Sequence, residues 1–220
     1  PFAATMLGLK QVYPGRYDPE LLVDLWQKEQ VTFSHCVPTI LQMVLNAKAA
    51  QGVDFKGWKL IIGGSALNRS LFLNAKERGM HLSTAYGMSE TGPIISGAYL
   101  NDGDLAGSED QRTASLLKAG VPVPLVQARI IDAEGKSLPH DGHAQGELVL
   151  RAPWLTMAYF NEPQKSAELW EGGWLHTGDV AAIGIGGAIE IRDRIKDVIK
   201  TGGEWISSLE LEDLISRHPA

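Results

Sequence analysis

Cysteine, basic charge and long apolar runs are all scarce in this sequence, and each absence excludes a class of protein. The 220 residues contain one cysteine, Cys36, so no disulfide can form within the chain, and a reducing cytoplasm is the expected location. The net charge of −6 argues against a nucleic-acid partner. No run of about 18 apolar residues occurs, so we expect no membrane span. The six histidines show no spacing typical of metal ligands.

The remaining composition is that of a globular protein. A hydrophobic content of 44% in 220 residues is enough for one large or two small domains with a core. Cys36 lies in the apolar run 31–37, so we expect a buried small side chain; a nucleophilic role is the alternative. The chain opens at Pro1 inside an apolar segment and closes at Ala220 just after an amphipathic pattern begins, which predicts a piece of a longer protein.

Helix and strand patterns alternate through the first hundred residues. Asp18 and Pro19 predict a helix start, and residues 31–37 a buried strand. Helices are also expected after Pro38 and over 68–79, with strands over 59–62 and 81–85. The apolar positions expected to face inward are Leu21, Leu22, Leu25 and Trp26 in the first helix and Ile40, Leu41, Val44 and Leu45 in the second. This alternation predicts a parallel sheet flanked by helices, with ligands beyond the carboxyl ends of its strands.

The second half of the chain has a different character. Residues 101–120 are polar with little periodicity, so we expect an exposed loop. Residues 127–132 and 146–151 have strand-like patterns and are joined through turns at Gly135 and Gly142. A small β-barrel or sheet, separate from the α/β part, is the prediction for this block.

The stretch Tyr86 to Gly92 offers the groups that a nucleotide phosphoester needs. Tyr86 has a flat ring for stacking on a base, and Glu90 a carboxylate suited to Mg²⁺. The hydroxyls of Ser89 and Thr91 suit phosphate oxygens, while Gly87 and Gly92 allow a close approach of backbone to ligand. The alternative is a simple turn between two strands.

Two later stretches carry further polar chemistry. Residues 174–179 form a strand-like run that ends at Asp179, whose carboxylate can accept hydrogen bonds from both hydroxyls of a ribose; a turn-capping aspartate is the alternative. Residues 193–205 hold three cations and a Gly-Gly pair before Trp205, which suits an anionic ligand beside a flexible joint. A charged hairpin is the alternative there.

Together these stretches resemble the adenylate-forming acyl-CoA synthetases. Residues 192–212 resemble that family's hinge motif, and residues 86–92 its adenine-and-phosphate motif. Residues 146–159 and then 176–179 match its next two motifs in the same order. The residues 204–208 that follow Gly203 are similar to the medium- or long-chain fatty-acyl branch, rather than to luciferases or peptide-synthetase domains.

The resemblance implies a fold and a division of the chain. We expect the α/β part of a large AMP-binding domain over 1–100, a loop and β-rich subdomain over 101–192, and a hinge with the start of a small α+β domain over 193–220. Asp193 would be the hinge. The family's phosphate loop would precede Pro1 and its catalytic lysine would follow Ala220, so the 220 residues alone are expected to be inactive.

The resemblance also assigns roles to individual residues. Gly64, Tyr86, Gly87 and Met88 would contact the nucleotide, Ser89 its α-phosphate (where the family usually has Thr) and Glu90 the Mg²⁺ ion. Asp179 and Arg194 would engage the ribose, and Lys196 and Lys200 would approach the nucleotide and phosphate. Ser89, Glu90 and Lys196 would serve catalysis. Val37, Pro38, Thr39, Gly63 and Gly64 would shape the acyl tunnel, with Trp205 at its entrance.

The implied activity is a two-step ligation. A fatty acid reacts with ATP and Mg²⁺ to give an acyl-adenylate, and the thiol of coenzyme A then displaces AMP. The alternatives are an adenylating enzyme for another carboxylic acid and a non-catalytic nucleotide-binding relative. The expected partners are these small molecules; a homo-oligomer is compatible with the sequence but nothing indicates one.

Overall fold

The computed structural model describes residues 2–197, 199–201, 204–206, 211 and 214–215, and for 199–201 and 204–206 it describes the backbone alone. The chain forms two compact units. Unit 1 comprises Pro1–Ser65 and Leu71–Leu82, and unit 2 comprises Ala66–Ser70 and Ser83–Ala220. The division into subdomains expected from the sequence stays a prediction.

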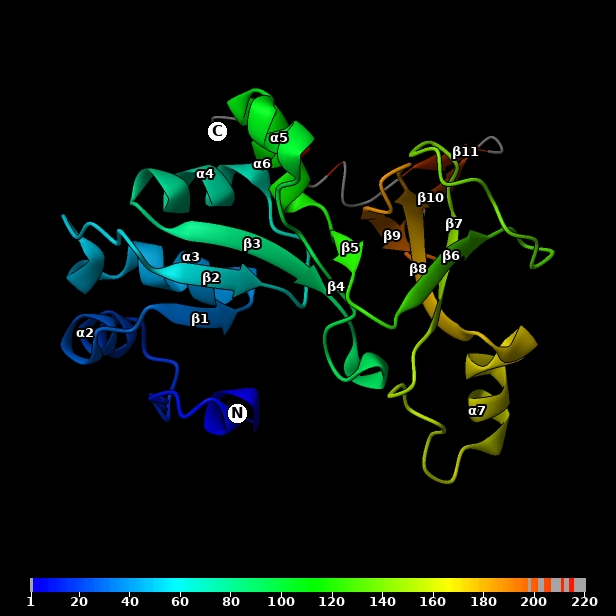
Figure 1. Cartoon of the computed structure of the whole chain (residues 1–220), viewed down its shortest axis with the longest axis horizontal. Helices are drawn as coiled ribbons and strands as arrows, with labels where there is room; N and C mark the ends of the chain where they lie inside the picture. The colour runs from blue at the N-terminus through cyan, green and yellow to red at the C-terminus, as the bar shows by residue number, and fades with distance from the viewer. Residues whose placement is uncertain (1, 198, 202–203, 207–210, 212–213, 216–220) are drawn as a thin grey trace. The chain divides into compact units, whose positions relative to one another are not determined.

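Unit 1 alternates helices with strands, as the sequence predicts. Figure 1 shows β1 (Phe33–Cys36) and β2 (Lys59–Ile62) side by side. These two strands pair in parallel, with Phe33 opposite Lys59 and Cys36 opposite Ile62. The elements in chain order are α1 (Phe2–Met6), α2 (Pro19–Glu29), β1 (Phe33–Cys36), α3 (Pro38–Asn46), the 3₁₀ turn η1 (Lys48–Ala50), β2 (Lys59–Ile62) and α4 (Arg69–Glu77).

Helix α2 begins where its capping residues place it. Asp18 Oδ1 accepts a hydrogen bond of 2.9 Å from the backbone N–H of Leu21, and Pro19 occupies the first turn. The predicted inward face of this helix is partly wrong. Val23 is the fully buried residue, whereas Leu21 is 39% exposed. In α3 the prediction is confirmed for Leu41, Val44 and Leu45, which are buried.

The core of unit 1 contains a cluster of three aromatic rings. The ring centroid of Trp26 lies 4.9 Å from that of Phe55 and 5.5 Å from that of Trp58. Because Phe55 is completely buried, this cluster anchors α2 to the segment that leads into β2.

Strand β1 is shorter and more exposed than the sequence suggests. It covers four residues, none of them buried, and Phe33 is 54% exposed. The strand predicted over 31–37 is thus present at Phe33–Cys36, but its expected burial is wrong. The strand order of this sheet is β1-β2-β3-β4-β5, so β1 is an edge strand with one paired neighbour, and side chains at an edge keep contact with solvent.

The same sheet continues with three strands in which each neighbouring pair is antiparallel. Strand β3 (His81–Tyr86) begins in unit 1 and ends in unit 2, where β4 (Ser96–Gly97) and β5 (Val121–Pro122) follow it in antiparallel pairs. The α/β fold is confirmed, but the sheet is mixed rather than wholly parallel. Gly79 has a φ of +86° after α4, as expected for a C-terminal cap.

Residues 101–120 contain two helices, so the predicted loop is wrong. The helices are α5 (Asp102–Ala106) and α6 (Glu109–Leu117). Each begins with a reciprocal capping box, Asn101 with Asp104 and Ser108 with Gln111. These short polar side chains satisfy the free N–H groups of a first helical turn, which offsets the weak apolar periodicity.

The β-rich block is a four-stranded antiparallel sheet with strand order β6-β7-β8-β9, as predicted (Figure 1). Its strands are β6 (Gln127–Ile131), β7 (Gly146–Arg151), β8 (Leu175–Ile183) and β9 (Ile189–Arg194), with η2 (Ser89–Thr91), α7 (Pro163–Leu169) and η3 (Glu171–Gly173) in the connections of unit 2. Its core is formed by Ile95, Ala119, Ile130, Leu148, Leu150, Leu155, Leu169, Leu175, Ala181, Ile183 and Ile189.

Two short strands occur near the end of the chain. Strands β10 (Ile199–Thr201) and β11 (Glu204–Ile206) pair antiparallel, with Lys200 opposite Trp205. The strands before and after the Gly-Gly pair therefore pair with each other, as in the hairpin that was the alternative to a flexible joint. The Gly-Gly pair itself lies outside the described residues.

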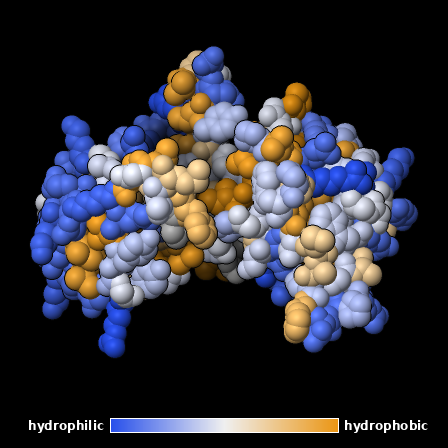
Figure 2. Space-filling view, turned by 60° about the horizontal axis from the view of Figure 1, so that its bottom comes forward, coloured by the Kyte–Doolittle hydropathy of each residue, from blue (hydrophilic) through white to orange (hydrophobic). Residues whose placement is uncertain are grey.

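Apolar side chains also reach the surface. Figure 2 shows orange atoms at several places on the face that it presents. Among the most exposed are Phe160 at 90% and Ile185 at 93%. None of the helices in the described part of the chain has the length and apolar character that crossing a membrane requires.

Candidate functional site

A carboxylate, a phenol and a guanidinium meet in unit 2 at the end of β3. Tyr86, the last residue of that strand, donates its hydroxyl to Asp179 Oδ2 at 2.5 Å. Arg194 Nε lies 3.6 Å from Asp179 Oδ1, and Arg194 stands opposite Asp179 in the β8–β9 ladder. Three residues that the sequence singled out are therefore brought together, although 93 positions separate Tyr86 from Asp179.

Burial shapes the electrostatics of this group. Asp179 is 9% exposed, and burial raises the pKa of its carboxyl, while the hydrogen bond from Tyr86 and the charge of Arg194 act against that rise. Burial, with the nearby negative charge of Asp179, raises the pKa of the Tyr86 phenol. The Arg194 side chain is 62% exposed, so the cation faces solvent beside a sheltered carboxylate.

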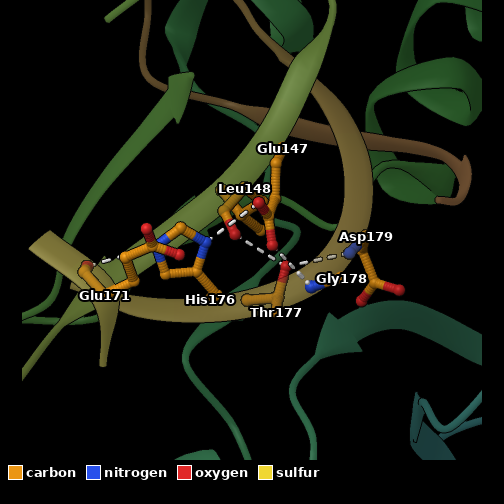
Figure 3. A network of polar contacts seen from close by, with 7 residues as sticks. All are labelled: Glu147, Leu148, Glu171, His176, Thr177, Gly178 and Asp179. Atoms are coloured by element: carbon orange, nitrogen blue, oxygen red, sulfur yellow. Dashed lines mark hydrogen bonds and ion pairs between the residues drawn. The ribbon is translucent and has the colours of Figure 1, made fainter. Parts of the chain in front are cut away.

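Asp179 lies inside a strand rather than at its end, and a polar network holds it there (Figure 3). Thr177 Oγ1 donates to the carbonyl of Leu148 at 2.7 Å and accepts from the N–H of Asp179 at 3.1 Å. Glu147 on β7 accepts from the N–H of Gly178 at 3.1 Å and lies 2.9 Å from His176 Nδ1. The motif at 176–179 marks this region in the sequence, but it predicts no role for Glu147 or for the Thr177 hydroxyl.

The turn after Tyr86 folds back closely on itself, and the Thr91 hydroxyl bridges it. An added Cβ on Gly87 would lie 1.6 Å from the carbonyl oxygen of Pro93, so glycine is required because the chain folds back on itself. The Thr91 hydroxyl is fully buried, accepts from the N–H of Met88 at 2.8 Å and donates to its carbonyl at 2.9 Å. The prediction that Thr91 offers its hydroxyl to phosphate is therefore wrong. Ser89, by contrast, is exposed.

Glu90 is held by Tyr159, the last residue of the 146–159 motif, to which the sequence assigned no role. The hydroxyl of Tyr159 donates to Glu90 Oε1 at 2.7 Å, and the N–H of Thr156 donates to the Glu90 carbonyl at 2.9 Å. The hydrogen bond to the Glu90 carboxylate raises the pKa of Tyr159 to about 12. Within the described residues no group of three or more acidic, His or Cys side chains gathers to hold a metal ion. A cation bound at Glu90 would therefore need ligands from phosphate and water as well.

The predicted acyl-pocket residues lie together in unit 1. Gly63 donates its N–H to the carbonyl of Cys36 at 3.2 Å, and Gly64 has a φ of +84°. A Cβ on Gly64 would lie 3.1 Å from Val37 Cγ1, and Pro38 follows as the start of α3. The ends of β1 and β2 thus place these residues side by side.

The predicted hinge and phosphate residues are described only in part. Asp193 is 3% exposed, stands opposite Val180 in the β8–β9 ladder and accepts from the N–H of Arg194 at 2.8 Å. Lys196 is exposed. The side chains of Lys200 and Trp205 lie outside the described part of the chain.

Cys36 is suited to packing rather than to nucleophilic chemistry. Cys36 is half-buried rather than fully buried as expected, and this partial burial raises the pKa of its thiol to about 11. At pH 8 only about one thiol in a thousand would be ionised. We therefore expect iodoacetamide to modify the Cys36 peptide slowly in the folded protein and roughly tenfold faster for each pH unit up to the pKa. Mass spectrometry of the peptide checks this, with unfolded protein as control; equal rates in both states would contradict it.

Comparison with known proteins gives consistent results. A family profile described as AMP-binding enzyme matches residues 1–160. The chain is 40% identical over 222 residues to a long-chain-fatty-acid–CoA ligase of Thermus thermophilus. It is 38% identical over 223 residues to a 3-methylmercaptopropionyl-CoA ligase of Ruegeria lacuscaerulensis. In both cases all of this chain aligns with 41% of the relative.

A solved structure supports the same fold. The anthranilate CoA ligase AuaEII in complex with anthranoyl-AMP matches with a TM-score of 0.80 and 25% sequence identity. The match covers 95% of this chain and 39% of that protein. The chain thus spans about two fifths of the length of the proteins it resembles.

Proposed function

The chain belongs to the family of AMP-binding enzymes, and from this premise we propose that its parent protein is an AMP-forming fatty-acid–CoA ligase. The first step would join the fatty-acid carboxylate to the α-phosphate of ATP and release pyrophosphate. In the second step the thiol of coenzyme A would displace AMP. The 40% identity to the Thermus thermophilus ligase supports the substrate class.

The observation that carries the proposal is the meeting of Tyr86, Asp179 and Arg194. A sheltered carboxylate with an exposed cation beside it suits a ribose, because the ribose hydroxyls can donate to Asp179 and accept from the guanidinium of Arg194. The Tyr86 ring lies next to them as the surface for adenine, with Gly87 and Met88 along the nucleotide. Holding the reactants in line supplies much of the rate in such a transfer.

Ser89 and Glu90 would then stand at the phosphates. The exposed hydroxyl of Ser89 would reach an α-phosphate oxygen, and the Glu90 carboxylate, oriented by the bond from Tyr159, would contact the cation. A single carboxylate fits Mg²⁺ when phosphate oxygens and water complete the coordination. When bound, Mg²⁺ would neutralise phosphate charge. Lys196 and Lys200 would add positive charge from the hinge side.

The acid would bind against the ends of β1 and β2. Val37, Pro38, Thr39, Gly63 and Gly64 form the proposed wall, in which an added Cβ on Gly64 would lie 3.1 Å from Val37 Cγ1. Trp205 as the tunnel entrance stays a prediction, as does a cytoplasmic location, which rests on the single cysteine.

The test is pyrophosphate exchange and thioester formation by the full-length protein with fatty acids of increasing length. Exchange that depends on a medium- or long-chain acid, followed by acyl-CoA formation, is expected. A second candidate is ligation of a short acid, which the 38% identity to the 3-methylmercaptopropionyl-CoA ligase favours. A kcat/KM higher for that acid than for fatty acids would replace the first proposal. AMP binding without exchange for any acid would indicate a non-catalytic relative.

Asp193 is proposed as the hinge at which the chain changes conformation between the two reaction steps. It is the next-to-last residue of β9, so a rotation there would move Arg194 and the segment after it, while residues 189–191 stay paired with β8. Proline would fix φ near −65° and remove the N–H. We expect Asp193→Pro in the full-length enzyme to keep acyl-adenylate formation while thioester formation falls by roughly 100-fold or more.

Single-turnover kinetics of each step on the same variant is the measurement for this hinge. Circular dichroism must first show an intact fold, because Asp193 is buried in a paired strand. Asp197→Pro, beyond the end of β9, serves as the matched control. Equal losses in both steps of a folded Asp193→Pro enzyme would place the joint elsewhere.

A further inference from the structure

The ladder between β7 and β8 is interrupted beside Asp179. Glu147 stands opposite Val180, yet Val149 stands opposite His176. One residue of β7, Leu148, therefore faces three residues of β8, Thr177 to Asp179. A regular ladder would place one residue there, so β8 carries a bulge of two extra residues. Gly178, at its centre, has a φ of +70°, a conformation that favours glycine.

Side chains replace the ladder hydrogen bonds that this bulge removes. The Gly178 N–H donates to Glu147 Oε1 at 3.1 Å, and the Asp179 N–H donates to Thr177 Oγ1 at 3.1 Å. The second oxygen of Glu147 lies 2.9 Å from His176 Nδ1. One carboxylate thus fixes β8 at two points, immediately before Asp179 and at the beginning of the bulge (Figure 3).

The bulge sets where the Asp179 carboxylate lies. Asp179 accepts the Tyr86 hydroxyl at 2.5 Å, so a shift of the backbone at the bulge would change the length and angle of this hydrogen bond. Glu147 acts one residue earlier, because it holds the N–H of Gly178. Loss of the Glu147 carboxylate would leave that N–H without this partner and release the bulge.

We propose that Glu147 is a positioning residue for the nucleotide site, holding the β8 bulge so that Asp179 presents its carboxylate to the ribose. This inference rests on the proposed function, since it assigns Asp179 to the nucleotide. It concerns geometry rather than charge. Burial first, and then the Glu147 charge, raise the pKa of Asp179, so removing that charge would make Asp179 more readily ionised and would not weaken a carboxylate acceptor.

Three variants of the full-length protein separate a geometric role of Glu147 from a role of its charge. Glu147→Ala removes both contacts and should raise the KM for ATP about tenfold, with the KM for fatty acid changed less than about twofold. Glu147→Gln keeps an acceptor for Gly178 without the charge and should stay within about threefold of wild type. Glu147→Asp keeps the charge on a shorter side chain and should resemble alanine. Glu134→Ala, in the exposed turn after β6, is the matched control.

The pattern among the variants decides the question. If Glu147→Ala does not fold, Glu147→Asp alone must raise the KM for ATP. Glutamine behaving like alanine, while aspartate behaves like wild type, would show that charge matters and overturn the inference. Unchanged KM for ATP in folded alanine and aspartate variants would also overturn it.

A calorimetric Kd for AMP keeps the inference separate from the proposed function. Wild-type protein that binds AMP but ligates no acid would overturn the proposed function, and weaker AMP binding by Glu147→Ala would then still support the inference. Wild-type ligase activity with equal AMP binding in wild type and Glu147→Ala would overturn the inference alone.

Discussion

Replacing Asp179 by alanine in the full-length enzyme is expected to lower kcat/KM for ATP about 100-fold. The buried carboxylate would accept the ribose hydroxyls as an ion, and a hydrogen bond to a charged group contributes about 1.5–3 kcal/mol. The same change leaves the Tyr86 hydroxyl without its acceptor and Arg194 without its ion pair. Steady-state kinetics at varied ATP is the measurement.

Tyr86→Phe is the matched control for this result. It removes the other partner of the same hydrogen bond but keeps the ring that would stack on adenine. We expect kcat/KM for ATP to fall less than about fivefold in this variant. A Tyr86→Phe loss as large as that of Asp179→Ala would show that the hydrogen bond itself, rather than the carboxylate, serves the nucleotide.

Gly87→Ala is expected to be the most disruptive single change in the motif after β3. Its Cβ would lie 1.6 Å from the carbonyl oxygen and 2.6 Å from the carbonyl carbon of Pro93. Both neighbours are backbone, held by the bond from the Ile95 N–H to the Tyr86 carbonyl at 2.9 Å, so neither can rotate away. The cost should be about 3 kcal/mol or more.

Thermal unfolding and AMP binding of the full-length protein check this prediction. Gly92→Ala is the control at the other end of the same turn. Its Cβ would meet the Trp154 side chain at 3.6 Å, an ordinary contact distance, so its cost comes from the φ of +65° and should be about 1–2 kcal/mol. Gly87→Ala with a thermal midpoint equal to that of Gly92→Ala would contradict the close approach of Gly87 to Pro93.

Caps and turns were predictable because their physics is local. Asp18 and Pro19 mark the start of α2, and Gly79 marks the end of α4, since each acts on atoms within a few residues of itself. The same kind of signal begins α5 at Asn101 and α6 at Ser108, where polar residues three positions apart cap one another. These two helices were predicted as a loop because their apolar residues show little helical periodicity.

Side-chain partners were not predictable, because they depend on strand order and register. Thr91 has a hydroxyl of the kind that binds phosphate, yet the turn buries that hydroxyl, which donates to the carbonyl of Met88 instead. Phe33 lies in an apolar run, yet β1 is at the edge of its sheet and stays exposed. Nothing within either segment distinguishes these outcomes from the expected ones.

The sequence by itself determined the α/β and β-rich parts of this chain and, through four ordered motifs, the family to which it belongs. Those features depend on residue types at short spacing. Only the tertiary structure decided that Tyr86 meets Asp179, that Tyr159 holds Glu90 and that Glu147 secures the β8 bulge. These pairs are separated by 93, 69 and 31 residues, so their contacts arise only when the strands have paired in one register.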